Sequence, residues 1–120
     1  MPETGKDEYK FILPMPPSVN SLWRTSGNKV YKSKKYKDWW AHAIWALASQ
    51  GSAKKITGRY KLSLYFKRPD NRRRDLDNLF KAVSDALQAA GIVTDDCNCS
   101  WLEAQWVEEG PECLIKIQCL

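Results

Sequence analysis

The chain has 120 residues with 43% hydrophobic residues, which suits one small folded domain and argues against disorder. It contains no apolar run long enough to cross a bilayer and no secretory signal, so we expect a cytoplasmic protein without a membrane partner. The net charge is +5 and the pI is about 9.1, and such an excess attracts polyanions, of which nucleic acid is the commonest. The alternative is a solvated basic surface.

The first half of the chain predicts a strand, a loop and a helix. Residues 1–8 are polar and predict a flexible tail, and alternation over 9–13 predicts a short strand. Prolines at 14, 16 and 17 end that strand, because they lack amide donors. A loop is expected through Asn20, Arg24, Gly27 and Asn28. Ser33 is a suitable cap for a helix that reaches about Gln50, with Gly51 as its stop. The inward stripe of this helix is predicted to hold Tyr36, Trp40, Ala43, Ile44 and Leu47. Trp39 and Trp45 lie off it and are expected to widen the core contact or form a dimer surface rather than to stack on bases.

The second half predicts a strand, a helix and two further strands. Alternation is clear over residues 60–67, and Pro69 and the two polar residues after it break the pattern. A helix is predicted over about 76–90 with Gly91 as its end, followed by strands over 101–106 and 113–119. We therefore expect residues 1–120 to form a single α+β domain. It would have a mixed sheet of about four strands and two helices, in the order β-α-β-α-β-β.

The four cysteines do not have the spacing of a typical zinc site. Cys97 and Cys99 form a Cys-x-Cys pair, and the only histidine, His42, is distant in sequence. Cys113 and Cys119 lie on the apolar face of the last predicted strand, as small core residues would. Without a secretory signal, reduced thiols are expected rather than disulfides.

Asp75 and Asp77 form the motif most suggestive of chemistry. They are separated by one residue at the start of the second predicted helix, where both carboxylates can face one cation. Mg²⁺ prefers such hard oxygen ligands. The pair is equally consistent with a capping residue and a favourable charge at a helix N-terminus.

Three neighbouring features favour the metal site. Arg72, Arg73 and Arg74 precede the acids, so a phosphate backbone and a cation could meet there. Lys81 lies one helical turn beyond Asp77, where it either stabilises charge on a phosphate or forms an ordinary surface pair. Asp85 is interpreted as the second helical partner of Lys81 rather than as a ligand. Asp95 and Asp96 follow the helix and add carboxylates for one or two cations.

These residues together resemble a known family. The stretch Arg-Arg-Arg-Asp-Leu-Asp-Asn-Leu-x-Lys-Ala at 72–82, Asp-Ala-Leu at 85–87, Ala-Gly at 90–91 and Asp-Asp at 95–96 resemble the RusA-type Holliday-junction resolvases. The stretch Leu-Pro-Met-Pro-Pro-Ser-Val-Asn at 13–20 resembles the opening block of the same family. Residues 97–120 match no motif of it.

The resemblance implies a homodimeric, Mg²⁺-dependent endonuclease acting on four-way DNA junctions in recombination and repair, with Mn²⁺ as a substitute. It implies catalytic and metal-binding roles for Asp75, Asp77 and Asp96, a functional role for Lys81, and supporting roles for Asn20, Asn78 and Asp95. The family includes prophage-borne members, which leaves a phage or a host origin open. Backbone contacts to DNA are expected from the basic residues Lys29, Lys32, Lys34, Lys35, Lys37, Lys67, Arg72, Arg73 and Arg74.

One geometric question and several alternatives stay open. A helix of about 14 residues is roughly 21 Å long, so Asp96 must return along it to reach Asp77. A site within one subunit is favoured over a ligand from the partner. The alternative functions are a nuclease that prefers forks or flaps, a catalytically silent junction-binding protein, and a basic protein-interaction domain.

Overall fold

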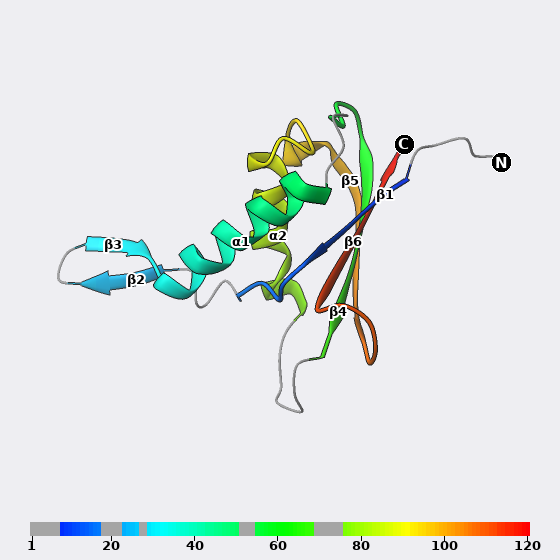
Figure 1. The fold of residues 1–120 in the computed structure, drawn as a ribbon. Helices are drawn as coiled ribbons and strands as arrows, with labels where there is room; N and C mark the ends of the chain where they lie inside the picture. The colour runs from blue at the N-terminus through cyan, green and yellow to red at the C-terminus, as the bar shows by residue number, and fades with distance from the viewer. Residues whose placement is uncertain (1–7, 18–22, 27–28, 51–54, 69–75) are drawn as a thin grey trace.

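The computed structural model describes residues 8–17, 23–26, 29–50, 55–68 and 76–120. Its main sheet has the strand order β1 (Glu8–Leu13), β6 (Cys113–Cys119), β4 (Tyr60–Lys67) and β5 (Cys99–Val107). Neighbouring strands are antiparallel except β4 and β5, which are parallel. Helices α1 (Lys34–Gln50) and α2 (Phe80–Ala89) lie on one face of this sheet, as Figure 1 shows. The predicted α+β class, mixed sheet and element order are confirmed.

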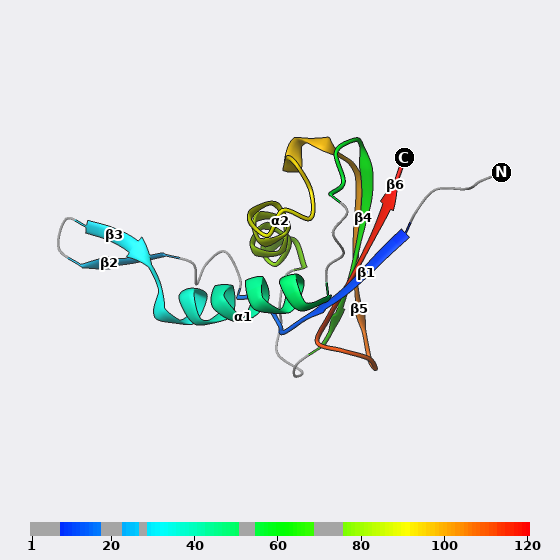
Figure 2. The same ribbon diagram turned by 45° about the horizontal axis from the view of Figure 1, so that its top comes forward.

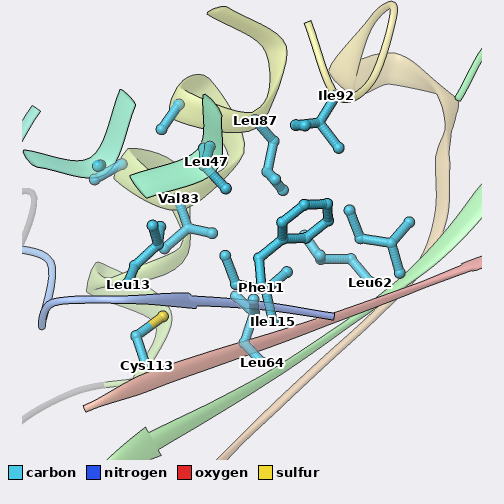
Figure 3. Close-up of a cluster of buried hydrophobic side chains, with 14 of the residues drawn as sticks. Phe11, Leu13, Leu47, Leu62, Leu64, Val83, Leu87, Ile92, Cys113 and Ile115 are labelled. Carbon is cyan, nitrogen blue, oxygen red and sulfur yellow. The ribbon is translucent and has the colours of Figure 1, made fainter. Parts of the chain in front are cut away.

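The core lies between the two helices and the sheet face that they cover. Alternate residues of β4 and β6 point into it, as the period of two in their sequences predicts. Figure 3 shows side chains from β1, α1 and α2 meeting these strands. The side chains that are 0% exposed are Ala43, Leu47, Leu64, Phe66, Val83, Ala86, Leu87, Cys113, Ile115 and Ile117.

Ser33 caps α1 as predicted. Its hydroxyl oxygen accepts a hydrogen bond from the Tyr36 amide at 3.1 Å, which satisfies an N–H at the helix start that has no partner within the helix. Trp39, which lies off the predicted stripe, widens the core contact, one of the alternatives that the sequence favours. Trp39 is buried, and its indole N–H donates to the Pro14 carbonyl at 3.0 Å. The packed segment after β1 widens the buried face of α1 beyond a narrow helical stripe.

The second helix is shorter than the range of about 76–90 that the sequence pattern predicts. Residues Leu76–Asn78 form the 3-10 turn η2, and α2 runs only over Phe80–Ala89. Gly91 ends it as expected with a φ of 79°, a conformation that glycine adopts without steric cost. The amides of Gly91 and Ile92 donate to the carbonyls of Gln88 and Leu87.

A hairpin occurs where a loop was expected. Strands β2 (Trp23–Ser26) and β3 (Lys29–Lys32) pair antiparallel and project away from the main sheet beside the start of α1 (Figures 1 and 2). Gly27 and Asn28 separate these runs by two residues, a sequence signal for a hairpin that the loop prediction overlooked.

Two other predictions concern the N-terminal tail and membrane-spanning segments. Of the expected tail, residues 1–7 lie outside the described part, whereas Glu8 already pairs with Gln118 in the sheet. Within the described ranges, no helix is long and apolar enough to cross a membrane.

Candidate functional site

The unit β4–α2–β5 holds the candidate acids whose positions are described. Asp77 lies in η2, directly before α2, while Asp96 begins the 3-10 turn η3 (Asp96–Asn98) directly before β5. Because β4 and β5 are parallel, the chain must return along α2 between them. Figure 1 shows η2 and η3 at opposite ends of α2. The fold therefore does not bring Asp77 and Asp96 together within one chain.

The turn that carries Asp96 is held from two sides. The Asp96 amide donates to the Gln88 side-chain oxygen at 3.0 Å, which fixes the turn to the end of α2. Beyond α2, the Ile56 amide donates to Ile92 and the Thr94 amide donates back to Ile56, at 2.8 and 3.0 Å. These bonds hold the turn in place, and Asp96 is exposed on it. Gln88 was missed in the sequence, because a polar residue on a helix ordinarily indicates only a solvated face.

Asp95 serves the local structure of the same turn. Its carboxylate accepts a hydrogen bond from the Cys97 amide at 3.0 Å, as a capping residue does. That backbone bond, together with one from the Cys97 thiol, holds the pKa of Asp95 below its usual value. This carboxylate is therefore already engaged within its own turn.

Tyr60 is buried close to this turn. Its side chain is 1% exposed, and its hydroxyl has no hydrogen-bond partner among the described residues. Burial raises the pKa of Tyr60 to about 12, with smaller contributions from Cys99, Asp96 and Asp95. The hydroxyl therefore stays neutral at physiological pH.

Lys81 pairs with Asp85, as the sequence spacing predicted. The ammonium nitrogen lies 3.4 Å from each of the two carboxylate oxygens of Asp85, and the Lys81 side chain is 57% exposed. An exposed pair of this kind contributes only a few tenths of a kcal/mol. The lysine is consequently held over the polar face of α2 but can leave it at little cost.

The predicted DNA contacts fall in two described places. Lys34, Lys35 and Lys37 are exposed on the first turn of α1, where Lys34 pairs with Asp38 at 2.9 Å. Lys67 is exposed at the end of β4. Lys29 and Lys32 belong to β3, of which only the backbone is described. The predictions for Asn20, Arg72, Arg73, Arg74 and Asp75 lie outside the described residues.

Another cation lies where β4 ends. The Arg68 guanidinium is 4.9 Å from the centre of the Trp106 ring in β5. The sequence does not predict this contact, because the pairing of β4 with β5 is a feature of the fold. Lys67 and Arg68 lie at the C-terminal end of β4, where their amides donate to the carbonyls of Glu112 and Val107. The turn η2, which holds Asp77 and the half-buried Asn78, contacts β5.

All four cysteines are reduced, and none is in a disulfide. Cys97 is exposed, Cys99 and Cys119 are half-buried, and Cys113 is buried in the core as expected. Burial raises the pKa of Cys113 to about 12. Across the described ranges, no three His, Cys, Asp or Glu side chains gather closely enough to hold a metal ion. Asp77 and Asp96 nevertheless supply the hard oxygen donors that Mg²⁺ prefers.

Comparison with known proteins identifies relatives over most of the chain. The family model "Endodeoxyribonuclease RusA" matches residues 14–118. A protein of Enterobacteria phage HK97 named crossover junction endodeoxyribonuclease is 39% identical over 93 residues, which cover 75% of each chain. Its namesake in Aquifex aeolicus is 34% identical over 88 residues, covering 73% of this chain and 69% of that one. The Escherichia coli K12 protein of that name is 39% identical over 92 residues, covering 73% of each.

Proposed function

This chain belongs to the RusA family of endodeoxyribonucleases, and from that premise we propose that it cleaves four-way DNA junctions in a Mg²⁺-dependent reaction. The observation that carries the proposal is the position of the exposed Asp77 in the turn η2, which contacts β5, inside the region that the family model covers. Mn²⁺ is expected to substitute, since it accepts the same oxygen ligands. The biological setting we propose is DNA recombination and repair.

Asp75, Asp77 and Asp96 are the proposed ligands. A divalent cation bound by them would supply Lewis-acid polarisation of the scissile phosphate. The carboxylates of Asp77 and Asp96 are both exposed, so neither is committed to the core, and both can accept a cation and a substrate. Asp95 holds the turn beside Asp96 through its bond to the Cys97 amide, and Asn78 and Asn20 are proposed as further supports.

Lys81 is proposed to stabilise negative charge on the phosphate. Its exposed ammonium group is paired with Asp85 through a weak contact at 3.4 Å, and a phosphodiester offers it an equally charged pair of oxygens. In the presence of DNA the lysine can exchange partners without breaking a buried interaction. Such electrostatic help matters most where charge develops in the transition state.

Basic side chains on two segments are proposed to hold the DNA backbone. Phosphate contacts of this kind give affinity and position but do not select a sequence. Their signature is a fall in affinity with rising salt. The proposed set is Lys29, Lys32, Lys34, Lys35, Lys37, Lys67, Arg72, Arg73 and Arg74.

The test is cleavage of a synthetic four-way junction with Mg²⁺ by the whole chain. Wild-type protein should cut the junction, whereas Asp75→Asn and Asp77→Asn should cut at least about a hundredfold more slowly, since each removes a ligand charge without changing shape. Glu8→Gln is the matched control, because it neutralises an exposed carboxylate on the far edge of the sheet. Equal cutting by all four proteins would remove both aspartates from the mechanism.

Competing substrates decide the specificity. Preferred cutting of forks or flaps would replace the junction as substrate. Salt-dependent binding with no cut product at any Mg²⁺ or Mn²⁺ concentration would indicate a binding protein, and the absence of DNA binding would remove the nucleic-acid proposal altogether.

A further inference from the structure

The main sheet has one face that no described element covers. Both helices lie on the opposite face, and the β2–β3 hairpin projects away from the sheet (Figures 1 and 2). Side chains alternate between the two faces along each strand, so the residues between the buried core positions of β4 and β6 point away from the helices. On this open face the strand registers gather Lys10, Lys61, Tyr65, Trp101, Glu103 and Lys116.

Two lysines of the open face lie directly opposite each other. Lys10 of β1 and Lys116 of β6 are register partners, and the Cβ atoms of such a pair are about 4.5–5.5 Å apart. Like charges in this arrangement destabilise a sheet, and neither ammonium group makes an ion pair with a described residue. On the other side of Lys116, its register partner in β4 is the uncharged Ser63. The face therefore holds two adjacent, uncompensated positive charges, and an anion bound between them would relieve their repulsion.

Two aromatic rings lie on the same face, each beside a lysine. Tyr65 of β4 is half-buried, and the Lys116 ammonium lies 5.2 Å from its ring centre. Trp101 of β5 is 55% exposed, and the Lys61 ammonium lies 3.9 Å from its ring centre. Lys61 also pairs with Glu103 at 3.0 Å, so the carboxylate compensates this lysine and leaves the opposed pair unaffected. Positive charge and accessible ring surface thus alternate across the face.

We propose that this open face binds single-stranded DNA. A phosphate lies between Lys10 and Lys116, and bases stack on Trp101 and Tyr65. Proteins that bind unpaired strands combine the same two components, which are cations that follow the phosphate backbone and aromatic rings on which bases stack. A duplex suits the face less well, because its bases are already stacked on one another and must be extruded before they can reach the rings.

The dimensions of the face suit a short stretch of an unpaired strand. From β1 to β5 the sheet measures about 14 Å, which is three strand spacings of about 4.8 Å. The strand order β1-β6-β4-β5 puts the opposed lysines on one side and Trp101 on the other edge, with Tyr65 between them. A nucleic-acid strand that crosses the sheet therefore meets phosphate-binding groups first and stacking groups next. An acidic protein segment would engage the lysines without requiring the rings.

This surface is separate from the proposed cleavage site. Asp77 lies in η2, which leads into α2 on the covered face of the sheet. The inference goes beyond the proposed nuclease function and does not depend on it, because binding of an unpaired strand is measured without cleavage. In a protein that cuts branched DNA, the open face would hold a single-stranded segment while the other face engages the branch.

Fluorescence anisotropy of a labelled oligothymidylate, about twelve nucleotides long, measures binding to the whole chain without Mg²⁺. Trp101→Ala should weaken binding about tenfold, as expected for the loss of one ring that stacks on a base. Lys10→Gln and Lys116→Gln should each reduce the slope of log affinity against log salt concentration by about 0.7. The matched controls are Trp45→Ala and Lys55→Gln, since each removes a similar exposed side chain away from this face.

Urea denaturation checks the folding of these variants and tests the opposed lysines independently. Lys10→Gln should be at least as stable as wild type at low salt, because it removes the repulsion with Lys116. A clear loss of stability in Lys10→Gln would contradict the argument that the two charges repel in the free protein.

Binding results then decide the proposal. Failure of wild type to bind the oligothymidylate, or equal binding by wild type, Trp101→Ala and Lys116→Gln, would overturn it. An equal loss in Lys55→Gln would overturn it as well, because binding would then follow total charge. Competition by polyglutamate, with Trp101→Ala binding as wild type does, would assign the face to an acidic protein partner instead.

A separate junction-cleavage assay distinguishes this inference from the proposed function. Variants of the open face that lose the oligothymidylate but cut four-way junctions at the wild-type rate would support a second DNA surface. A chain that binds the oligothymidylate through Trp101 and Lys116 but cuts no junction would refute the proposed nuclease function and retain this surface.

Discussion

Replacing Gln50 tests how the protein protects one sheet edge. The Gln50 amide makes two hydrogen bonds to Ile12, of 2.6 and 2.7 Å, and thereby ties the last residue of α1 to β1. A hydrogen bond contributes about 0.5–1.5 kcal/mol net. Both bonds are exposed to solvent, so we take the lower part of that range and expect Gln50→Ala to lower the free energy of unfolding by about 1–2 kcal/mol.

Gln50→Glu is the informative companion. Ionised glutamate still accepts from the Ile12 amide, but its second oxygen faces the Ile12 carbonyl, where two acceptors repel. Protonation restores a donor, so the fold favours the neutral acid and raises the pKa of this group above its usual value of about 4.3. The stabilisation is therefore present below that value and is lost as the pH rises through the raised folded-state pKa.

Urea denaturation of both variants and wild type at pH 7 and pH 4 measures these differences. Comparison with Gln50→Ala at each pH removes the general effect of acid on the protein. Gln50→Glu should be no more stable than Gln50→Ala at pH 7 and more stable at pH 4. Two variants within about 0.3 kcal/mol of wild type at both pH values would refute the reasoning, because such a difference is below what one net hydrogen bond contributes.

Three further predictions concern buried groups and thiols. Tyr60→Phe removes a buried hydroxyl without a partner among the described residues and should stabilise the protein by about 1 kcal/mol in urea denaturation; unchanged or lower stability would mean that the hydroxyl is satisfied. Since the pKa of Tyr60 is raised to about 12 in the fold, neutral Tyr60 contributes stability below pH 10 that is lost as the pH rises towards 12, and the pH dependence of unfolding should be weaker in Tyr60→Phe. Mass-spectrometric mapping after brief treatment of the native protein with a thiol reagent should find Cys97 labelled and Cys113 protected, and rapid labelling of Cys113 would contradict its burial. Trp39→Phe removes the bond to the Pro14 carbonyl and should lower stability by about 1–3 kcal/mol, whereas an unchanged melting curve would show that water replaces it.

The main elements were readable in the sequence because their signals are local. Ser33, Gly91 and the alternation over 60–67 each act through bonds or side-chain directions within a few residues, and all three predictions are confirmed. The hairpin of β2 and β3 was also encoded locally, by Gly27 and Asn28, and was missed in reading rather than absent from the sequence.

Other features depend on which segments meet and could not be read from local patterns. The indole N–H of Trp39 has a partner only because the chain after β1 passes close to α1 and offers the Pro14 carbonyl. Gln88 positions Asp96 only because α2 ends beside the turn before β5. Neither contact can be recognised from sequence periodicity or residue spacing. Trp39 and Pro14 are distant in sequence, and Gln88 contacts the Asp96 amide through a single hydrogen bond.

The candidate site also combines features that the sequence determines with features that only the fold determines. By itself, the sequence determined which residues can hold a cation, because an Asp-x-Asp pair, a later Asp-Asp pair and a lysine one turn away state their chemistry wherever they lie. Only the tertiary structure decided how far apart Asp77 and Asp96 are. The parallel order of β4 and β5 places them at opposite ends of α2. The acids that the sequence suggests for one site are thus kept apart by the connection between two parallel strands, which no local sequence pattern specifies.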